Sequence, residues 1–138
     1  MIVTGTVVHG KELGRRLGFP TANLAPDGPV EGANGVYAAA IWIEGEPLPR
    51  RCMVNQGVHP TAPEGRPTIE AHLLDYTGNL YGRRTRIEYL RFLRPERRFD
   101  GLDALRAQLG RDLEATRAYL DGLGREWMEG RRDAAIEQ

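Results

Sequence analysis

The spacing of apolar residues changes once along this chain of 138 residues, close to residue 100. Before that point, short stretches either alternate apolar and polar side chains or are apolar throughout, and turn residues such as Gly45, Pro47 and Gly65 separate them. This pattern is typical of antiparallel strands. The sequence therefore predicts a mainly β domain of the α+β class, with an antiparallel sheet or small barrel followed by a C-terminal helix. The leucines with helical spacing that predict this helix are Leu102, Leu105, Leu109, Leu113, Leu120 and Leu123.

Five stretches match the strand pattern, and a connection rich in Gly, Pro and Asn, residues 10–35, follows the first of them. The second stretch, VYAAAIWI, is too continuously apolar for a sheet with one solvated face, so we expect both of its faces to be covered. The five stretches are residues 2–9, 36–43, 51–55, 68–74 and 85–93.

The helix has signals at both of its ends. Asp100, followed three residues later by Asp103, is the expected N-cap, and Gly122 with Gly124 is the expected end. Residues 1–124 would then form the domain, and residues 125–138 a polar C-terminal tail.

Composition excludes several classes of function. The 19 basic and 19 acidic residues give a formal net charge of zero, which argues against a general nucleic-acid binder and gives no reason to expect a membrane partner. The single cysteine, Cys52, excludes an internal disulfide, and its surroundings predict an inert core thiol. No secretory leader is visible in the N-terminal MIVTGTVVHG, so we expect a cytoplasmic protein.

Residues 5–12, GTVVHGKE, imitate a phosphate-binding P-loop. The motif requires Ser or Thr where this chain has Glu12, and a strand before the loop. Since Val7 and Val8 themselves have the pattern of a strand, we interpret these residues as a first strand that ends in a glycine turn.

The next segment, GKELGRRLG at residues 10–18, has two possible readings. Its glycines would let the backbone approach a ligand closely, and Lys11, Arg15 and Arg16 could bind phosphate groups. The same residues would equally suit a mobile surface loop with solvated basic side chains.

The sequence PTAN at residues 20–23 places a hydroxyl and an amide two residues apart behind a proline. In an extended backbone, Thr21 and Asn23 would point the same way, and their neutral oxygens could share a magnesium ion. The alternative is an Asx or ST turn that only caps local backbone groups.

Glu70 lies on the polar side of a predicted strand, TIEAHLLD. A carboxylate on a rigid strand could act as the general base for an alcohol, or it could be a rim carboxylate paired with an arginine. His72 shares this side of the strand and is expected to be structural. The three histidines have no metal-site spacing.

Taken in order, these motifs resemble those of the riboflavin kinases (flavokinases). The resemblance rests on GTVVHG and GRRLGFPTANL, then GVYAA at 35–39, NQGVHPT at 55–61 and IEAHLLD at 69–75, followed by LYG at 80–82, LRPERRFDGL at 93–102 and DLEATR at 112–117. It covers roughly residues 2–120 and implies a six-stranded antiparallel Greek-key β-barrel followed by a long helix. It also implies transfer of the ATP γ-phosphate to riboflavin.

The resemblance also assigns roles to residues. Glu70 would be the catalytic base, Thr21 and Asn23 would hold Mg²⁺, and Mn²⁺ or Zn²⁺ could replace that ion. The nucleotide side would be formed by Gly10, Gly14, Arg15, Pro20, Thr21, Asn23, Leu80 and Tyr81. The flavin side would be formed by Arg94, Glu96, Phe99 and Leu102.

Two departures from the family pattern stand out. Gln56 and His59 replace residues that are often an aliphatic side chain and an arginine. Many bacterial members are also fused to an FMN adenylyltransferase module, and nothing in this sequence resembles one. We expect a monomer whose partners are small molecules, with such a module fused or associated in the native protein.

The competing interpretation is a non-catalytic barrel that binds flavin or oligonucleotide. Binding of single strands would need aromatic side chains exposed on adjacent strands. The candidates are Trp42, Tyr89 and Phe92, and we expect each of them in the core.

Overall fold

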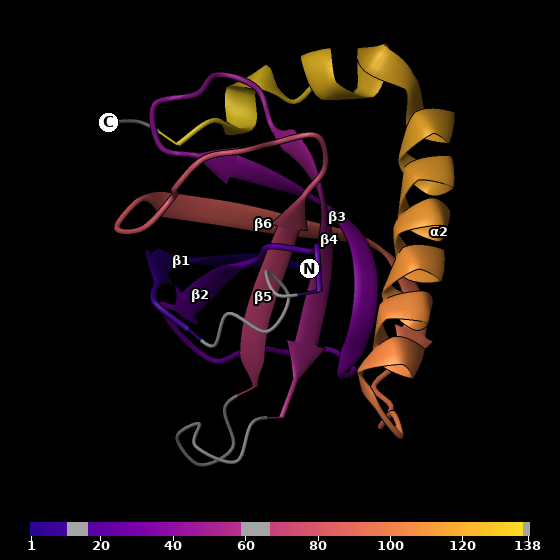
Figure 1. Cartoon of the computed structure of the whole chain (residues 1–138). Helices are drawn as coiled ribbons and strands as arrows, with labels where there is room; N and C mark the ends of the chain where they lie inside the picture. Colours follow the sequence, from indigo (N-terminus) through magenta and orange to yellow (C-terminus); the bar gives the residue numbers. More distant parts are fainter. Residues whose placement is uncertain (11–16, 59–66, 137–138) are drawn as a thin grey trace.

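The computed structural model describes residues 1–10, 17–58 and 67–136. The chain forms a barrel of six strands, and a long helix lies along one side of it (Figure 1). The strands are β1 (Ile2–Val8), β2 (Ala22–Pro26), β3 (Gly35–Ile43), β4 (Arg50–Gly57), β5 (Thr68–Leu73) and β6 (Arg84–Pro95). The helix is α2 (Leu102–Glu129), and a short 3₁₀ turn, η1 (Arg132–Ala134), follows it.

The strands close into a barrel in the order β1-β2-β5-β4-β3-β6, and every neighbouring pair is antiparallel. Strands β3, β4 and β5 follow one another as neighbours, and the long connection from β2 to β3 brings β2 back beside β5. This arrangement is a Greek key. The expected barrel and the helix after it are therefore confirmed.

Side chains that alternate along each strand fill the barrel. On β5, Ile69, Ala71 and Leu73 point into the core, while Glu70 and His72 lie on the outer side. Cys52 is also fully buried in this core, as expected, and burial raises the pKa of its thiol.

Strand β3 is buried along its whole length, as its continuous apolar sequence predicted. Its inner side chains belong to the barrel core, and its outer face is covered by other elements. Ala38 on that face packs with Leu74 and with Leu120 of α2, in a second apolar cluster. The sheet therefore needs the helix to cover it.

Strand β2 lies inside the segment that the residue pattern predicted to be a long connection. Its sequence, ANLAP, contains no β-branched residue, so its local preference for a strand is weak. Hydrogen-bonded pairing with β1 on one side and β5 on the other places these residues in the barrel.

The helix differs from its expected ends. Asp100 is not the N-cap: that position is Gly101, and no side chain caps it. Gly124 breaks the helical geometry with φ 76° and ψ 172°, but helical structure resumes and continues to Glu129. No helix in the described part of the chain is both long and apolar enough to cross a membrane.

Residues after the break return to the barrel and run across one end of it (Figure 1). The guanidinium group of Arg86 on β6 donates a hydrogen bond to the carbonyl oxygen of Ala134. Arg131 lies 3.5 Å from the carboxylate of Glu88 and 4.4 Å above the ring of Trp127. We expected residues 125–138 to form a polar tail, but Arg131 and Ala134 contact strand β6.

Candidate active site

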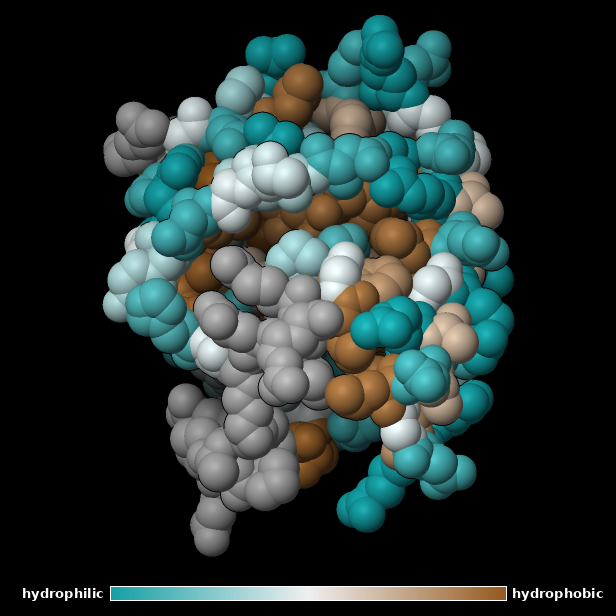
Figure 2. Space-filling view, in the orientation of Figure 1, coloured by the Kyte–Doolittle hydropathy of each residue, from teal (hydrophilic) through white to brown (hydrophobic). Residues whose placement is uncertain are grey.

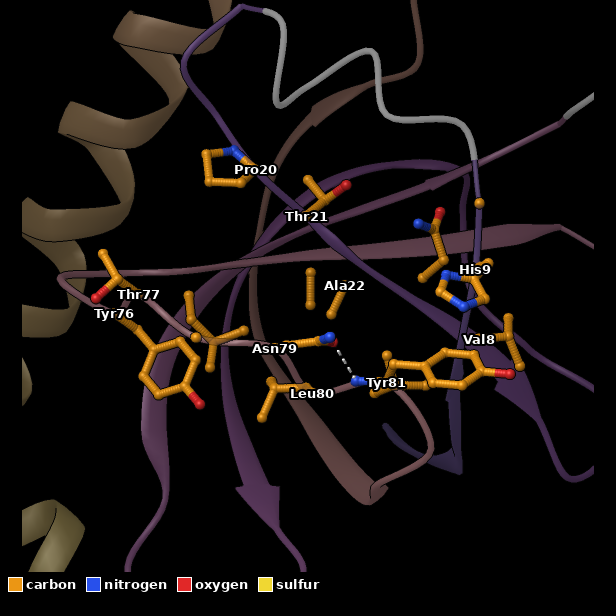
Figure 3. A pocket seen from close by; sticks show the side chains of 16 residues that line it. Val8, His9, Pro20, Thr21, Ala22, Tyr76, Thr77, Asn79, Leu80 and Tyr81 are labelled. Carbon is orange, nitrogen blue, oxygen red and sulfur yellow. Dashed lines mark hydrogen bonds between the residues drawn. The ribbon is translucent and has the colours of Figure 1, made fainter.

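A cavity of about 650 Å³ opens at the rim of the barrel. Its walls come from three places: the end of β1, the start of β2, and the turn between β5 and β6 (Figure 3). Figure 2 shows apolar side chains in the middle of one face of the molecule, surrounded by hydrophilic ones. The cavity is lined by Val7, Val8, His9, Gly10, Pro20, Thr21, Ala22, Asn23, Ala71, Leu73, Tyr76, Thr77, Gly78, Asn79, Leu80 and Tyr81.

Asn23 and Glu70 lie directly opposite each other on β2 and β5. Their neighbours Leu24 and Ile69 point into the core, so the side chains of Asn23 and Glu70 both stand on the outer face of the barrel. Side chains in such a position are about 5 Å apart at their Cβ atoms. Asn23 lines the cavity, whereas Glu70, its partner across the two strands, is not one of the lining residues.

Burial raises the pKa of the Glu70 carboxyl, because the partly buried group has lost part of its hydration shell. No ion pair joins Glu70 to a described arginine or lysine. The alternative of a rim carboxylate neutralised by an arginine therefore has no support in the described part of the chain. A carboxylate with a raised pKa is a better proton acceptor than an ordinary exposed one.

Gly10 makes close backbone contact with Asn23. A Cβ atom at position 10 would overlap the Asn23 carboxamide, so only a glycine fits there without moving that side chain. The turn after β1 and the PTAN segment are therefore packed together at the cavity.

His72 fixes the start of the PTAN segment. Its Nδ1 atom lies 2.8 Å from the carbonyl oxygen of Pro20. A carbonyl oxygen can only accept, so Nδ1 carries the proton and donates it. The ring also packs edge-on against Phe19, with 5.8 Å between centroids. His72 thus has the structural role that we expected.

His9 and Tyr81 form one wall of the cavity. Their rings stack with centroids 3.8 Å apart, and they lie side by side in Figure 3. Asn79 holds the turn that carries Tyr81, because its side-chain oxygen accepts a 2.8 Å hydrogen bond from the Tyr81 backbone N–H. Leu80, which lies between Asn79 and Tyr81 in the sequence, is buried in the barrel core. Leu80 and Tyr81 were predicted from the sequence, whereas His9 and Asn79 were not, because the only signal for them was their nearness in sequence to Gly10 and Tyr81.

The residues predicted for a flavin make contacts of their own. The Arg94 guanidinium binds both carboxylate oxygens of the buried Asp112 on α2, at 2.7–3.0 Å. The half-buried Phe99 ring lies 5.6 Å from the Arg94 guanidinium and 4.9 Å from that of Arg97. Leu102, the first residue of α2, is exposed. Arg94 therefore ties β6 to the helix.

Some residues singled out in the sequence lie outside the described residues, namely Lys11, Glu12, Gly14, Arg15, Arg16, His59 and Gly65. Gln56, the other departure from the family pattern, is buried inside the barrel. Its Oε1 accepts a 2.9 Å hydrogen bond from the Tyr89 hydroxyl, and its Nε2 donates to the carbonyl oxygen of Gly32 at 3.2 Å. This side chain anchors the connection between β2 and β3.

The side chains at the cavity suit a hard divalent cation only in part. Thr21 and Asn23 offer neutral oxygens, the kind of ligand that Mg²⁺ takes in small number while it keeps water and phosphate oxygens. Among the described residues, no group of three His, Cys, Asp or Glu could hold a metal ion by itself. The donor set therefore fits an ion that arrives with a phosphate group.

Fold and site together define a small closed β-barrel with a cavity at its rim, and a partly buried carboxylate on a strand pairs with Asn23, one of the residues that line that cavity. A family model described as flavokinase, riboflavin kinase, matches residues 1–120. The chain therefore belongs to the riboflavin kinase family.

Individual relatives agree with this assignment. Over 118 residues the chain is 43% identical to the bifunctional riboflavin kinase/FMN adenylyltransferase of Escherichia coli K12, an alignment that covers 85% of this chain and 37% of that protein. The chain thus spans little more than a third of the length of such relatives.

Solved structures support the fold. A riboflavin kinase from Trypanosoma brucei superposes with a TM-score of 0.63 at 22% identity, over 95% of this chain and 81% of that one. A Streptococcus pneumoniae structure described as a macrolide-efflux protein gives a TM-score of 0.74 at 33% identity, over 84% of this chain and 38% of that one.

Proposed function

We propose that this protein is a riboflavin kinase, which transfers the γ-phosphate of ATP to the 5′-hydroxyl of riboflavin and releases FMN and ADP. Family membership supports the proposal. The structural observation that carries it is the pairing of Asn23, which lines the open cavity, with Glu70 across β2 and β5. A phosphoryl transfer needs a phosphate-binding group and a proton acceptor next to each other, since positioning supplies most of the catalysis.

Glu70 is the proposed general base. The hydroxyl oxygen of the acceptor attacks the γ-phosphorus, its proton passes to a carboxylate oxygen of Glu70, and the bond from the γ-phosphorus to the bridging oxygen breaks with the electrons leaving on ADP. The raised pKa of Glu70 suits this role, because it brings the proton affinity of the carboxylate closer to the working pH.

ATP would occupy the cavity, with its phosphates toward Thr21, Asn23 and Gly10. Mg²⁺, or Mn²⁺ or Zn²⁺ in its place, would be held by the oxygens of Thr21 and Asn23 and would supply charge neutralisation there. No described lining residue is an arginine or a lysine. We propose that Arg15 supplies positive charge to the phosphates and that the backbone at Gly14 approaches them closely. Pro20, Leu80 and Tyr81 would complete the nucleotide side.

The flavin would bind on the other side of Glu70, near Phe99 and the start of α2 at Leu102. Arg94 and Glu96 remain candidates there. Their described contacts favour a role in holding this region together, because Arg94 binds Asp112 and Glu96 binds the backbone at Val58.

A non-catalytic oligonucleotide-binding barrel has little support. Two of the three aromatic candidates, Trp42 and Tyr89, are 1% and 8% exposed and unavailable for base stacking. The prediction was wrong for Phe92, which is 44% exposed, but one aromatic ring does not form a stacking platform.

An association with an FMN adenylyltransferase module is also proposed, because the E. coli relative carries both activities in one longer chain. Co-purification with such a module, or conversion of the FMN product to FAD in its presence, would test this part separately.

The deciding experiment measures FMN formed from riboflavin, ATP and Mg²⁺ by chromatography, with wild type beside Glu70→Gln and Asn23→Ala. We expect each variant to lose about a hundredfold or more in kcat. Glu114→Gln, a change on the exposed side of α2, is the matched control and should be fully active. A wild type that binds riboflavin but forms no FMN with any divalent ion would overturn the proposal.

A further inference from the structure

The row of outward-facing residues that contains Asn23 and Glu70 continues on the far side of Glu70. Strand β4 pairs with β5 so that Asn55 stands opposite Glu70, as Asn23 does from the other side. Val54 and Cys52 on β4 belong to the core, so the Asn55 side chain points outward like that of Glu70. The row in order across four strands is Val8, Asn23, Glu70 and Asn55.

Asn55 is a polar residue whose side chain has no evident structural role among the described residues. It is exposed, and among the described residues it forms no side-chain hydrogen bond. It does not line the cavity, whereas Asn23 does. Glu70 therefore stands between two amide side chains, of which Asn23 lines the cavity and Asn55 does not.

A phosphoryl transfer brings two substrates to one proton acceptor. The attacking and leaving oxygens lie roughly in line on opposite sides of the transferred phosphorus. If the nucleotide enters from the Asn23 side, the acceptor alcohol reaches Glu70 from the other side, where Asn55 stands.

The end of β4 is held in place by Glu96. Its carboxylate accepts a 3.1 Å hydrogen bond from the backbone N–H of Val58, and its own backbone N–H donates to the carbonyl oxygen of Asn34 at 3.2 Å. A Cβ atom at Gly57 would come within 2.5 Å of the Glu96 carboxylate, so this close contact depends on the glycine. Asn55 lies two residues before Gly57, on the same side of the strand.

We propose that Asn55 contacts the acceptor substrate, its carboxamide binding a hydroxyl of the ribityl chain next to the one that is phosphorylated, and that Glu96 is a positioning residue for the strand end that presents Asn55. This inference rests on the proposed function. A carboxamide can both donate and accept a hydrogen bond. It therefore suits the neighbouring hydroxyl groups of the ribityl chain.

The test compares wild type with Asn55→Ala in steady-state assays of FMN formation. We expect KM for riboflavin to rise about five- to tenfold, the effect of one neutral hydrogen bond, with KM for ATP changed less than twofold. Asn79→Ala is the reciprocal control, because Asn79 holds the Tyr81 turn on the nucleotide side, and it should raise KM for ATP instead.

A second acceptor separates a hydrogen bond from a general disturbance. A flavin whose side chain is an unbranched pentyl group with only the terminal hydroxyl lacks the inner hydroxyls. Wild type and Asn55→Ala should use this analogue equally well. If the variant is impaired to the same degree with both acceptors, or if KM for riboflavin does not change, the assignment of Asn55 is wrong.

The role of Glu96 has its own control. Glu96→Ala should raise KM for riboflavin several-fold, while Glu96→Gln, which keeps an accepting oxygen, should restore most of it. Combined with Asn55→Ala, Glu96→Ala should add little, because both act through the same contact. Additive effects would show that Glu96 acts independently of Asn55.

Failure of the proposed function can be told apart from failure of this inference. Riboflavin binding is measured directly, without ATP, by quenching of flavin fluorescence. If wild type forms no FMN but Asn55→Ala weakens riboflavin binding about five- to tenfold, the inference stands while the kinase proposal falls. Equal binding by the two proteins overturns the inference in either case.

Discussion

Asn23, which lines the cavity, and Glu70 face each other across adjacent antiparallel strands. The distance between their side chains is set by the pairing register of β2 and β5, because neither residue lies in a loop. Residues on paired strands hold such a geometry without reorganisation, which is what a transfer reaction with little covalent chemistry requires.

Substitution of Gly10 by Ala should impair the site without unfolding the protein. The added Cβ would overlap the Asn23 carboxamide and turn it away from the cavity. We expect kcat/KM for ATP to fall about tenfold or more, measured as FMN formation. Gly28→Ala is the control, since a Cβ there meets nothing within 4 Å, and it should be silent. Equal activity of the two variants would contradict the contact.

The pH dependence of the reaction should report Glu70. Only the ionised carboxylate accepts a proton, so kcat/KM should fall as the pH decreases through the pKa of Glu70. Burial raises that pKa, so the acidic limb should lie above the range of an exposed glutamate. A profile of kcat/KM against pH checks this. A limb at the ordinary glutamate value, or its persistence in Glu70→Gln, argues for another base.

The same raised pKa has a consequence for stability. Glu70 holds its proton more tightly in the folded than in the unfolded state, so ionising it as the pH rises disfavours folding. Glu70→Gln should therefore raise Tm at pH 7 by about 1–3 °C, while its activity is lost. The gain should vanish below the pKa of an unfolded glutamate, at about pH 4. Thermal unfolding followed by circular dichroism at both pH values measures it, and a lower Tm at pH 7 would speak against the desolvation of Glu70.

Arg94 and Asp112 should behave as one unit in unfolding experiments. Asp112 is 4% exposed and binds Arg94 through three short hydrogen bonds. Removal of either partner leaves the other charge buried, so Arg94→Ala and Asp112→Ala should each cost about 3 kcal/mol. The double variant should cost far less than the sum. A double-mutant cycle measures this, from the free energy of unfolding in urea of wild type, the two single variants and the double variant. Additive losses would mean that the pair contributes little to docking α2.

Gly124 and Gly122 should respond to alanine with opposite signs. Gly124 has φ 76° and ψ 172°, a conformation almost confined to glycine, so Gly124→Ala should destabilise by about 1–3 kcal/mol. Gly122 is helical with open space around it, so Gly122→Ala should stabilise by about 0.5–1 kcal/mol. The free energy of unfolding in urea decides, and a stabilising Gly124→Ala would show that the break in α2 is not required.

Much of the fold could be predicted from local pattern, because alternation along Thr68–Leu73 and the apolar run of β3 are properties of single segments. What failed depends on distant partners. Strand β2 exists because β1 and β5 pair with it, and the Asp100 side chain did not become a cap because Gly101 takes that position.

The candidate site divides in the same way. Thr21, Asn23 and Glu70 could be named from residue chemistry and from the order of motifs. Their alignment could not, since a shift of one residue in the pairing of β2 with β5 would place Glu70 on the other side of the sheet. The same dependence on register hid Asn55, and the stacking of His9 on Tyr81 brings together the end of β1 and the turn between β5 and β6.

The burial of Cys52 makes the protein suitable for site-specific labelling at an introduced cysteine. It is the only cysteine in the chain, and its fully buried thiol with a raised pKa should not react with maleimide dyes while the barrel is folded. A cysteine introduced at the exposed Val58 would then be the single point of attachment. A fluorophore there would report arrival of the flavin in real time.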